Sequence, residues 1–294
     1  MYHIALSKAV DFSQAGGKAA NLARAVQLGF QVPEGFALSR AALRFFLETN
    51  RFLPNVRTTL EGYDGLEWRE RMERFEALRA AALKLPIPRA VQAEVEPLFL
   101  ELLDRSPAGV AVRSSSVCED LEMASFAGIY ASFLGMITLE DFWQSVVRCW
   151  CSTWSPQAVA HAQKMGILIS IDSIGVLVQT LIPAESSGVA FTVDPVTGNL
   201  WHFVLNATFG LAPRLVDGSA PADRFVLAWD NGEILEKRIV RKPGALVFQD
   251  ERVCEVALPE RQPQTTSLSD EQAQAVGKMA LAADRTFDRR MDLE

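Results

Sequence analysis

The spacing of apolar residues changes along this chain, and that change constrains the fold more than any single motif does. In segments 66–85 and 89–103 the apolar residues recur near helical spacing, and prolines separate the two segments. From residue 174 onward they form short runs between turn residues, which is typical of strands. Strands are expected at 174–181, 188–193, 201–207, 224–229 and 233–240, and a closing helix at 270–287. The sequence therefore predicts an α+β fold with a helix-rich first lobe, residues 1–183, and a β-rich second lobe, residues 184–294.

The composition excludes several classes of protein. With 294 residues, 49% of them hydrophobic, the chain can bury a sizeable core and is not mainly disordered. Its formal net charge of −7 argues against a nucleic-acid or acidic-membrane binder, which needs a basic surface. The longest apolar runs are about eight residues, short of the ~20 that span a bilayer, and the N-terminal segment lacks a signal-peptide pattern. The four cysteines show no CxxC or zinc-ligand spacing, so we expect reduced thiols in a cytoplasmic protein.

Two adjacent glycines and a lysine precede the first expected helix. Gly16 and Gly17 allow a ligand to approach the backbone closely, and the start of a helix offers free N–H groups and a positive dipole end. Lys18 adds a full positive charge, so the turn suits an oligophosphate. It is not a P-loop, because Ala19 stands where a serine or threonine would hold Mg²⁺. By itself the pattern is weak, because glycine turns before helices are more often simple turns than binding sites.

A second segment places an arginine and three hydroxyl groups at the end of a buried strand. Arg113 follows the apolar run 110–112 and precedes Ser114, Ser115 and Ser116. A planar guanidinium beside small donors suits phosphate recognition. The alternative is a surface loop in which Arg113 pairs with an acidic residue at 119 or 120.

Three further segments allow either a binding role or a structural one. Residues 125–128, which end at Gly128, suit a flap whose backbone covers phosphates, or a tight turn before a strand. Residues 176–183 suit a hinge strand against a purine, or simply a core strand. Asp292 and Glu294 alternate on an extended segment, so both can point toward one cation, or both can be solvated. The three histidines lie far from any nucleophile motif, and we assign them no catalytic role.

The order of these motifs resembles the nucleotide-binding domain of the phosphoenolpyruvate synthase and pyruvate phosphate dikinase family, which includes the rifampicin phosphotransferases. The resemblance covers nearly the whole chain. The matching segments are the GGKxANL and VPxGFxxS patterns at 16–22 and 32–39, the VAVRSS pattern at 110–134, the VxVQ…SGVxFTxDPxTG pattern at 176–198, the NAxxGL…DRxV pattern at 206–226 and the PMDxEW-like end at 290–294.

The resemblance implies an ATP-grasp-like bilobal fold that holds ATP and Mg²⁺ and supports phosphoryl transfer. In that reading Lys18 and Arg113 are the catalytic, phosphate-contacting residues, and Asp292 and Glu294 are the metal ligands. The remaining nucleotide-binding candidates are Ser115, Gly128, Gln179, Leu181 and Glu185, with Gln179 and Leu181 at the adenine and Glu185 at the ribose.

The same resemblance implies partners that these residues do not contain. The phosphate acceptor would be a histidine on a separate swivelling domain, which delivers phosphate to pyruvate or another small acceptor on a third domain. Such domains would lie in cis or on separate subunits. The chain departs from the family pattern at Ile129, Gln157 and the Ala212–Pro213 pair, and it contains no THxA-type histidine motif. Two alternatives therefore stand: a non-catalytic or regulatory nucleotide-binding subunit, and the ATP-binding subunit of a split enzyme acting on an unusual acceptor such as an antibiotic or phenol.

Overall fold

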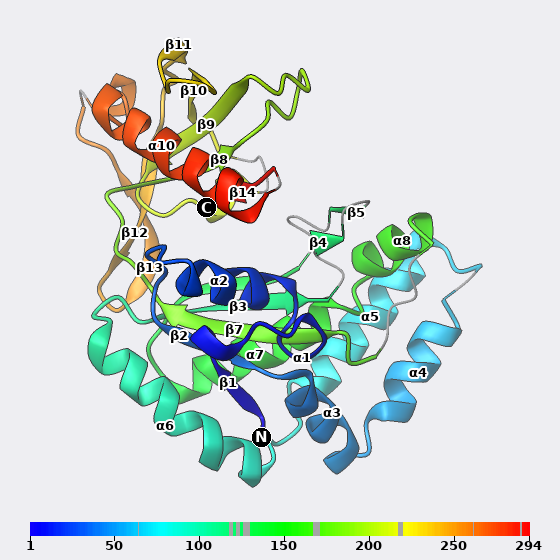
Figure 1. Cartoon of the computed structure of the whole chain (residues 1–294). Helices are drawn as coiled ribbons and strands as arrows, with labels where there is room; N and C mark the ends of the chain where they lie inside the picture. The colour runs from blue at the N-terminus through cyan, green and yellow to red at the C-terminus, as the bar shows by residue number, and fades with distance from the viewer. Residues whose placement is uncertain are drawn as a thin grey trace. The chain divides into compact units, whose positions relative to one another are not determined.

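The computed structural model divides into two compact units, Met1–Ile182 and Pro183–Glu294. It describes residues 1–63, 65–117, 120–121, 124–125, 130–166, 171–216, 220–260, 262–288 and 290–294. Gly128 and Ile129 lie outside the described residues. The mixture of helices and sheets confirms the predicted combination of helix and strand (Figure 1).

The first unit contains a five-stranded sheet in the order β1-β2-β7-β3-β6, and each neighbouring pair is antiparallel. The strands are β1 (His3–Ala5), β2 (Gly35–Leu38), β7 (Ile174–Thr180), β3 (Val110–Ser116) and β6 (Ser132–Met136). A short hairpin, β4 (Asp120–Leu121) with β5 (Ala124–Ser125), follows β3. Strand β6 begins at Ser132, which pairs with Arg113 of β3.

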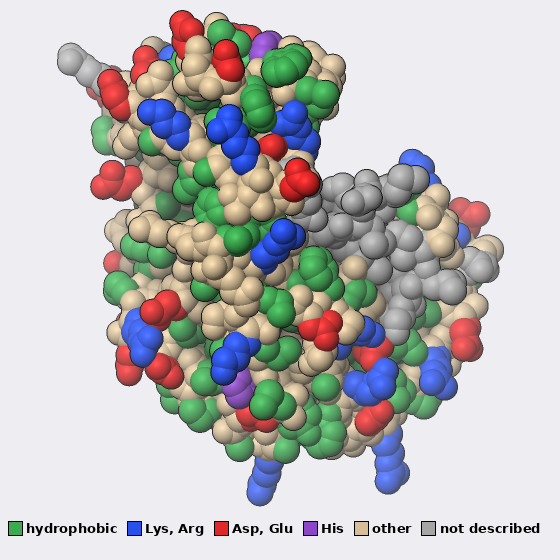
Figure 2. All heavy atoms as spheres, in the orientation of Figure 1, with side chains coloured by type: hydrophobic (Ala, Val, Ile, Leu, Met, Phe, Trp, Pro, Cys, Tyr) green, Lys and Arg blue, Asp and Glu red, His purple; other side chains and the backbone are tan. Residues whose placement is uncertain are grey.

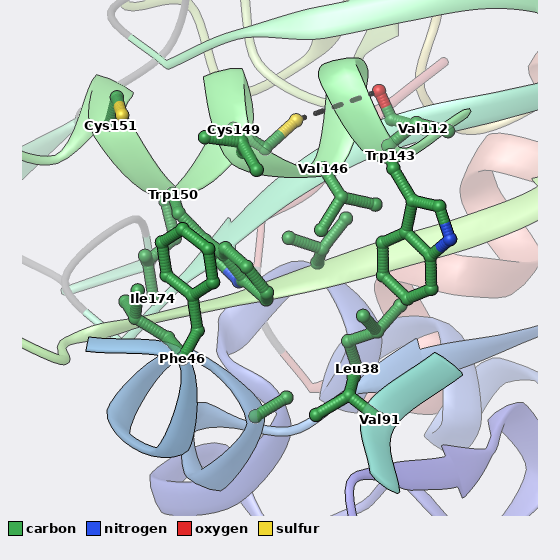
Figure 3. Close-up of a cluster of buried hydrophobic side chains, with 14 of the residues drawn as sticks. Leu38, Phe46, Val91, Val112, Trp143, Val146, Cys149, Trp150, Cys151 and Ile174 are labelled. Carbon is green, nitrogen blue, oxygen red and sulfur yellow. Dashed lines mark hydrogen bonds between the residues drawn. The ribbon is translucent and has the colours of Figure 1, made fainter. Parts of the chain in front are cut away.

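Helices cover both faces of this sheet (Figure 1). The small residues Ala19 and Ala23 of one helix, α2, pack with Ala37 and Leu177 on one face. The other face carries the larger core, in which Phe46 and Trp150 pack at 5.1 Å between ring centroids (Figure 3). The helices of the unit are α1 (Phe12–Ala15), α2 (Gly17–Gln27), α3 (Arg40–Thr49), α4 (Leu53–Glu61), α5 (Trp68–Ala82), α6 (Arg89–Arg105), α7 (Leu139–Ser152) and α8 (Pro156–Lys164), with a 3₁₀ turn, η1 (Leu6–Lys8).

The second unit is a sheet packed against one long helix. Its strands run in the order β11-β10-β9-β8-β14, all antiparallel, and the helix α10 (Asp270–Phe287) covers an apolar face formed by residues such as Leu205 and Phe225. The strands are β8 (Ser186–Phe191), β9 (His202–Phe209), β10 (Asp223–Ala228), β11 (Ile234–Arg238) and β14 (Asp292–Leu293). A separate hairpin, β12 (Gly244–Gln249) with β13 (Arg252–Ala257), a short helix, α9 (Pro213–Val216), and a 3₁₀ turn, η2 (Gln262–Gln264), complete the unit.

The surface charges and the cysteine side chains are as the sequence leads us to expect. On the face shown in Figure 2, lysine and arginine side chains are interspersed with aspartate and glutamate. Cys149, Cys151 and Cys254 are free thiols. No helix within the described ranges is both long enough and apolar enough to span a membrane.

Candidate functional site

The glycine turn before α2 lies directly on strand β3. Gly16 has φ +82°, and a Cβ there would lie 1.8 Å from the carbonyl oxygen of Ser115. Gly175 of β7, which is paired with Ser115, is also confined, since its Cβ would lie 2.7 Å from the carbonyl oxygen of Ala15. Residues without side chains are therefore required on both surfaces, and the contact fixes the turn against the sheet.

Ser115 caps helix α2 from another part of the chain. Gly16 occupies the N-cap position and has no side chain that can accept a hydrogen bond. The Ser115 hydroxyl oxygen instead accepts the N–H of Ala19 at 3.0 Å, across 96 residues of sequence, and the Ser115 side chain is fully buried. This contact places the first turn of α2, which carries Lys18, beside β3.

Arg113 lies on the same face of the sheet as Ser115. Successive strand residues alternate between faces, so Arg113 and Ser115 both face the α2 side, roughly 7 Å apart along the strand. Both Arg113 and Lys18 are half-buried. The structure thus brings the two predicted phosphate-contacting residues to one face of one unit, on neighbouring elements.

An arginine that the sequence analysis missed holds the other end of the same turn. Arg40, the first residue of α3, donates through Nη1 to the carbonyl oxygen of Ser13 at 2.8 Å. Its Nε donates to the carbonyl oxygen of Asp172, and its Nη2 lies 3.2 Å from the Asp172 carboxylate. Arg44, one helical turn later, binds the other oxygen of that carboxylate at 2.8 Å. The only signal in the sequence is the i, i+4 spacing of two arginines, which is common on exposed helices.

The predicted adenine-contacting residues are engaged within the protein. Gln179 is buried on the α2 side of β7, and its Nε2 donates to the carbonyl oxygen of Pro33 at 3.0 Å. The N–H of Leu181 donates to the carbonyl oxygen of Gly109 at 3.0 Å, and the Leu181 carbonyl accepts the hydroxyl of Ser106 at 3.2 Å. A purine contact at Leu181 would therefore use a second lone pair of its carbonyl or its side chain, rather than its N–H.

The remaining predicted residues belong to the second unit or lie outside the described residues. Glu185 is exposed, and its carbonyl oxygen accepts the N–H of Gly210 at 2.8 Å. Asp292 and Leu293 form β14, which pairs with β8, and Leu293 packs against the core of this unit. Asp292 and Glu294 are exposed and alternate with Leu293, so they lie on the opposite side of the segment.

This donor set fits Mg²⁺ bound jointly with phosphates. Mg²⁺ prefers oxygen ligands and is commonly held by one or two carboxylates together with substrate phosphates and water. Asp292 and Glu294 would supply such a pair. Within the described residues, no group of three or more histidine, cysteine, aspartate or glutamate side chains converges as a complete metal site.

The motif residue Arg224 has a structural partner, the carboxylate of Asp194. Arg224 donates to the carboxylate of Asp194 at 3.1 Å, while the Asp194 carboxylate accepts the N–H of Val196. The N–H groups of Val196 and Thr197 and the Arg224 guanidinium hold the pKa of Asp194 below its usual range, against the opposing effect of burial. Gly198 closes the loop with φ +69°, and its N–H donates to the carbonyl oxygen of Asp194 at 2.8 Å.

Comparison with known proteins places the chain in a family. Residues 12–294 match the family model described as the AMP/ATP-binding domain of pyruvate phosphate dikinase. The chain is 30% identical to the phosphoenolpyruvate synthase of Aeropyrum pernix, over 95% of this chain and 38% of that protein. It is 31% identical to the rifampicin phosphotransferase of a Streptomyces species, over 97% of this chain and 33% of that protein.

A probable phosphoenolpyruvate synthase of Methanocaldococcus jannaschii is 28% identical over 97% of this chain and 24% of that protein. The chain thus spans less than two-fifths of the length of these three relatives. The family match extends from α1 to the last residue and includes the glycine turn, Arg113 and the terminal carboxylates. The chain belongs to the family of pyruvate phosphate dikinase AMP/ATP-binding domains.

Proposed function

We propose that this chain binds ATP·Mg²⁺ and is the ATP-binding part of a phosphotransferase. The observation that carries the proposal is the docking of the Lys18 turn on β3, on the same face as Arg113. Lys18 and Arg113 would bind the phosphates, and Asp292 and Glu294 would hold Mg²⁺ on them. In phosphoryl transfer the protein mainly positions groups and neutralises charge, and two cations and a metal supply both effects.

The proposal includes the arrangement that the family resemblance implies. ATP would be held in an ATP-grasp-like manner, and the phosphate would pass to a histidine on a separate swivelling domain. That domain would deliver it to pyruvate or another small acceptor. The relatives named above include a phosphoenolpyruvate synthase and a rifampicin phosphotransferase at 30% and 31% identity, so the acceptor is proposed only as a small molecule.

Calorimetric titration with the non-hydrolysable ATP analogue AMP-PNP, with and without Mg²⁺, tests the binding function. The intact chain is expected to bind the analogue, and Arg113→Ala to weaken binding about tenfold or more, since hydrogen bonds between charged groups contribute ~1.5–3 kcal/mol. Arg69→Ala is the matched control, because the Arg69 side chain is 90% exposed on α5 in the same unit. Absence of binding at millimolar analogue would overturn the proposed function. Equal affinities of the Arg113 and Arg69 variants would place the phosphates elsewhere.

A further inference from the structure

The turn that carries Lys18 is held at three points by contacts with other segments of the chain. Arg40 binds the carbonyl oxygen of Ser13 before the turn, at 2.8 Å. Gly16 presses against the backbone of Ser115 in the middle. The hydroxyl of Ser115 accepts the N–H of Ala19 immediately after Lys18, at 3.0 Å. The backbone on both sides of Lys18 is therefore fixed before any ligand binds.

Ser115 has the burial of a supporting residue rather than of a ligand-contacting one. Its side chain has no exposed surface, and its oxygen already accepts the N–H of Ala19. That N–H is one of the donors at the start of α2 that has no partner within the helix. Without the Ser115 hydroxyl, the first turn of α2 would lose its cap, and the direction of the Lys18 side chain would no longer be fixed.

We propose that Ser115 and Arg40 are positioning residues that set the location of the Lys18 ammonium for phosphate binding, and that Ser115 does not contact the nucleotide. This inference rests on the proposed ATP-binding function. It assigns to Ser115 a different role from the direct contact implied by the family resemblance. A residue that acts through Lys18 has no effect of its own once Lys18 is removed, whereas a residue that contacts the nucleotide directly keeps its effect.

A double-mutant cycle distinguishes the two roles. AMP-PNP·Mg²⁺ affinity is measured by calorimetry for the intact chain, Ser115→Ala, Lys18→Ala and the double variant. We expect Ser115→Ala to weaken binding about tenfold, and the double variant to bind within about twofold of Lys18→Ala alone. Multiplicative effects, about a hundredfold in the double variant when each single change costs tenfold, would show direct contact and overturn the inference. So would an unchanged affinity of Ser115→Ala.

Ser155→Ala is the matched control for loss of a helix cap. Ser155 caps α8 in the same unit by accepting the N–H of Ala158 at 3.1 Å. Both substitutions are expected to reduce stability by a similar amount, about 0.5–2 kcal/mol, but only Ser115→Ala should change nucleotide affinity. Equal affinity losses in both variants would mean that stability alone explains the effect, and would overturn the positioning role.

Arg40 provides a second, independent variant in case Ser115→Ala does not fold. Arg40→Met removes the bond to Ser13, whereas Arg44→Met removes only a contact to Asp172 and leaves that carboxylate paired with Arg40. We expect Arg40→Met to weaken analogue binding severalfold and Arg44→Met to leave it unchanged. Equal affinities for these two variants would overturn the role of Arg40. If the intact chain binds no nucleotide, the proposed function fails, and the inference that rests on it fails with it.

Hydrogen exchange gives a ligand-free readout of the same contact. The amide of Ala19 should exchange faster in Ser115→Ala than in the intact chain, while the amide of Ala158 should not change. An unchanged Ala19 exchange rate would show that the hydroxyl does not hold the turn, whatever the affinities are.

Discussion

Lys242 and Asp223 form an ion pair in which neither side chain has any exposed surface. The Asp223 carboxylate also accepts the N–H groups of Val240 and Ser267 and the Ser267 hydroxyl. The pair therefore joins β10, the segment before β12 and the segment before α10. Burial raises the pKa of Asp223. The Lys242 ammonium and these donors lower it by a larger amount, so the net shift of the pKa is downward.

Removing one partner of this pair should be strongly destabilising. Lys242→Met leaves a buried carboxylate without its counter-charge, which typically costs about 3–5 kcal/mol of unfolding free energy. Lys237→Met is the matched control, because Lys237 pairs with the exposed Asp270 and such pairs contribute about 0–1 kcal/mol. Urea denaturation followed by circular dichroism measures both. Equal losses in the two variants would contradict a special role for the buried pair.

The lowered pKa of Asp223 also gives a direction to the pH dependence of stability. Because the native pKa lies below the ordinary value of 3.8, the unfolded chain binds the proton first as pH falls. The contribution of Asp223 is fully present above that ordinary value and is lost as pH falls through it toward the native pKa. Asp223→Asn should therefore show a shallower loss of stability with acidification in this range than the intact chain does.

Gly16→Ala should destabilise the protein much more than Gly29→Ala. Both glycines have a positive φ, +82° and +84°, which strains other residues by about 1–3 kcal/mol, and Gly16, with ψ 169°, lies in a region that essentially only glycine adopts. Only Gly16 is in close contact, with the Ser115 carbonyl oxygen 1.8 Å from the added Cβ, whereas no described atom lies within 4 Å at Gly29. We expect a further loss of at least ~1–3 kcal/mol at Gly16 in urea denaturation. Similar losses at both positions would show that β3 does not confine the turn.

Several helix boundaries were predictable from the sequence. Pro86 and Pro88 separate α5 from α6 as expected, because proline cannot continue a helix. Ser155 caps α8 with Pro156 at its first position, and Ser269 caps α10 at the expected start. Each of these signals acts within a few residues, so no knowledge of the rest of the fold was required.

Features that depend on distant parts of the chain were not predictable in the same way. Alternation along a strand gives its faces but not its neighbours, so the position of β7 between β2 and β3 was not expected. The β12–β13 hairpin was missed because its turn residues, Asp250 and Glu251, adopt positive φ without the glycine that usually signals such a turn. Helix α4, which carries Pro54 in its first turn, was also missed.

The candidate site shows the same division. Lys18 and Arg113 were predicted from the residue types that favour phosphate binding. The support around them was not, since the contact between Ser115 and Ala19 crosses 96 residues and the Arg40 contact crosses 27. No local pattern encodes such contacts. The nucleotide- and metal-binding roles themselves stay predictions.

The buried cysteines should be unreactive in the native protein. Burial raises the pKa of Cys151 to about 12, so its thiol stays protonated at neutral pH, and the thiolate is the reactive form. Cys149 is also fully buried, with its Sγ 3.8 Å from the carbonyl oxygen of Val112 (Figure 3). In a Cys118→Ser/Cys254→Ser variant, Ellman's reagent should detect almost no thiol before unfolding and both thiols in urea. Rapid reaction of the native variant at pH 7 would contradict this burial.

The same shift predicts an effect at alkaline pH. Below the ordinary thiol pKa of 9.0 both states keep the Cys151 proton, so stability does not depend on it. Above 9.0 the unfolded chain loses the proton while the native chain keeps it, and stability falls as pH rises. Cys151→Ala should reduce the slope of stability between pH 9 and 11, measured by urea denaturation at each pH. An unchanged slope would mean that another group governs the alkaline loss.

Asp292 and Glu294 should be responsible for the Mg²⁺ dependence of nucleotide binding. Both carboxylates are exposed on one side of the β14 segment, and the opposite side packs through Leu293, so their replacement should leave the fold intact. In the intact chain Mg²⁺ should tighten AMP-PNP binding. The Asp292→Asn/Glu294→Gln variant should lose about tenfold of that gain, ~1.4 kcal/mol, and bind the metal-free analogue at least as well as the intact chain does.

The reason for the second expectation is electrostatic. Without the metal, two carboxylates near a polyphosphate repel it, so their neutralisation favours binding, whereas with the metal they are attractive ligands. Glu233→Gln/Glu236→Gln is the matched control: it removes the same charge from exposed positions around β11, at the other edge of the same sheet. A metal ligand pair predicts opposite effects with and without Mg²⁺ in the Asp292/Glu294 variant only. A uniform change in both double variants would show a general charge effect and refute metal binding by Asp292 and Glu294.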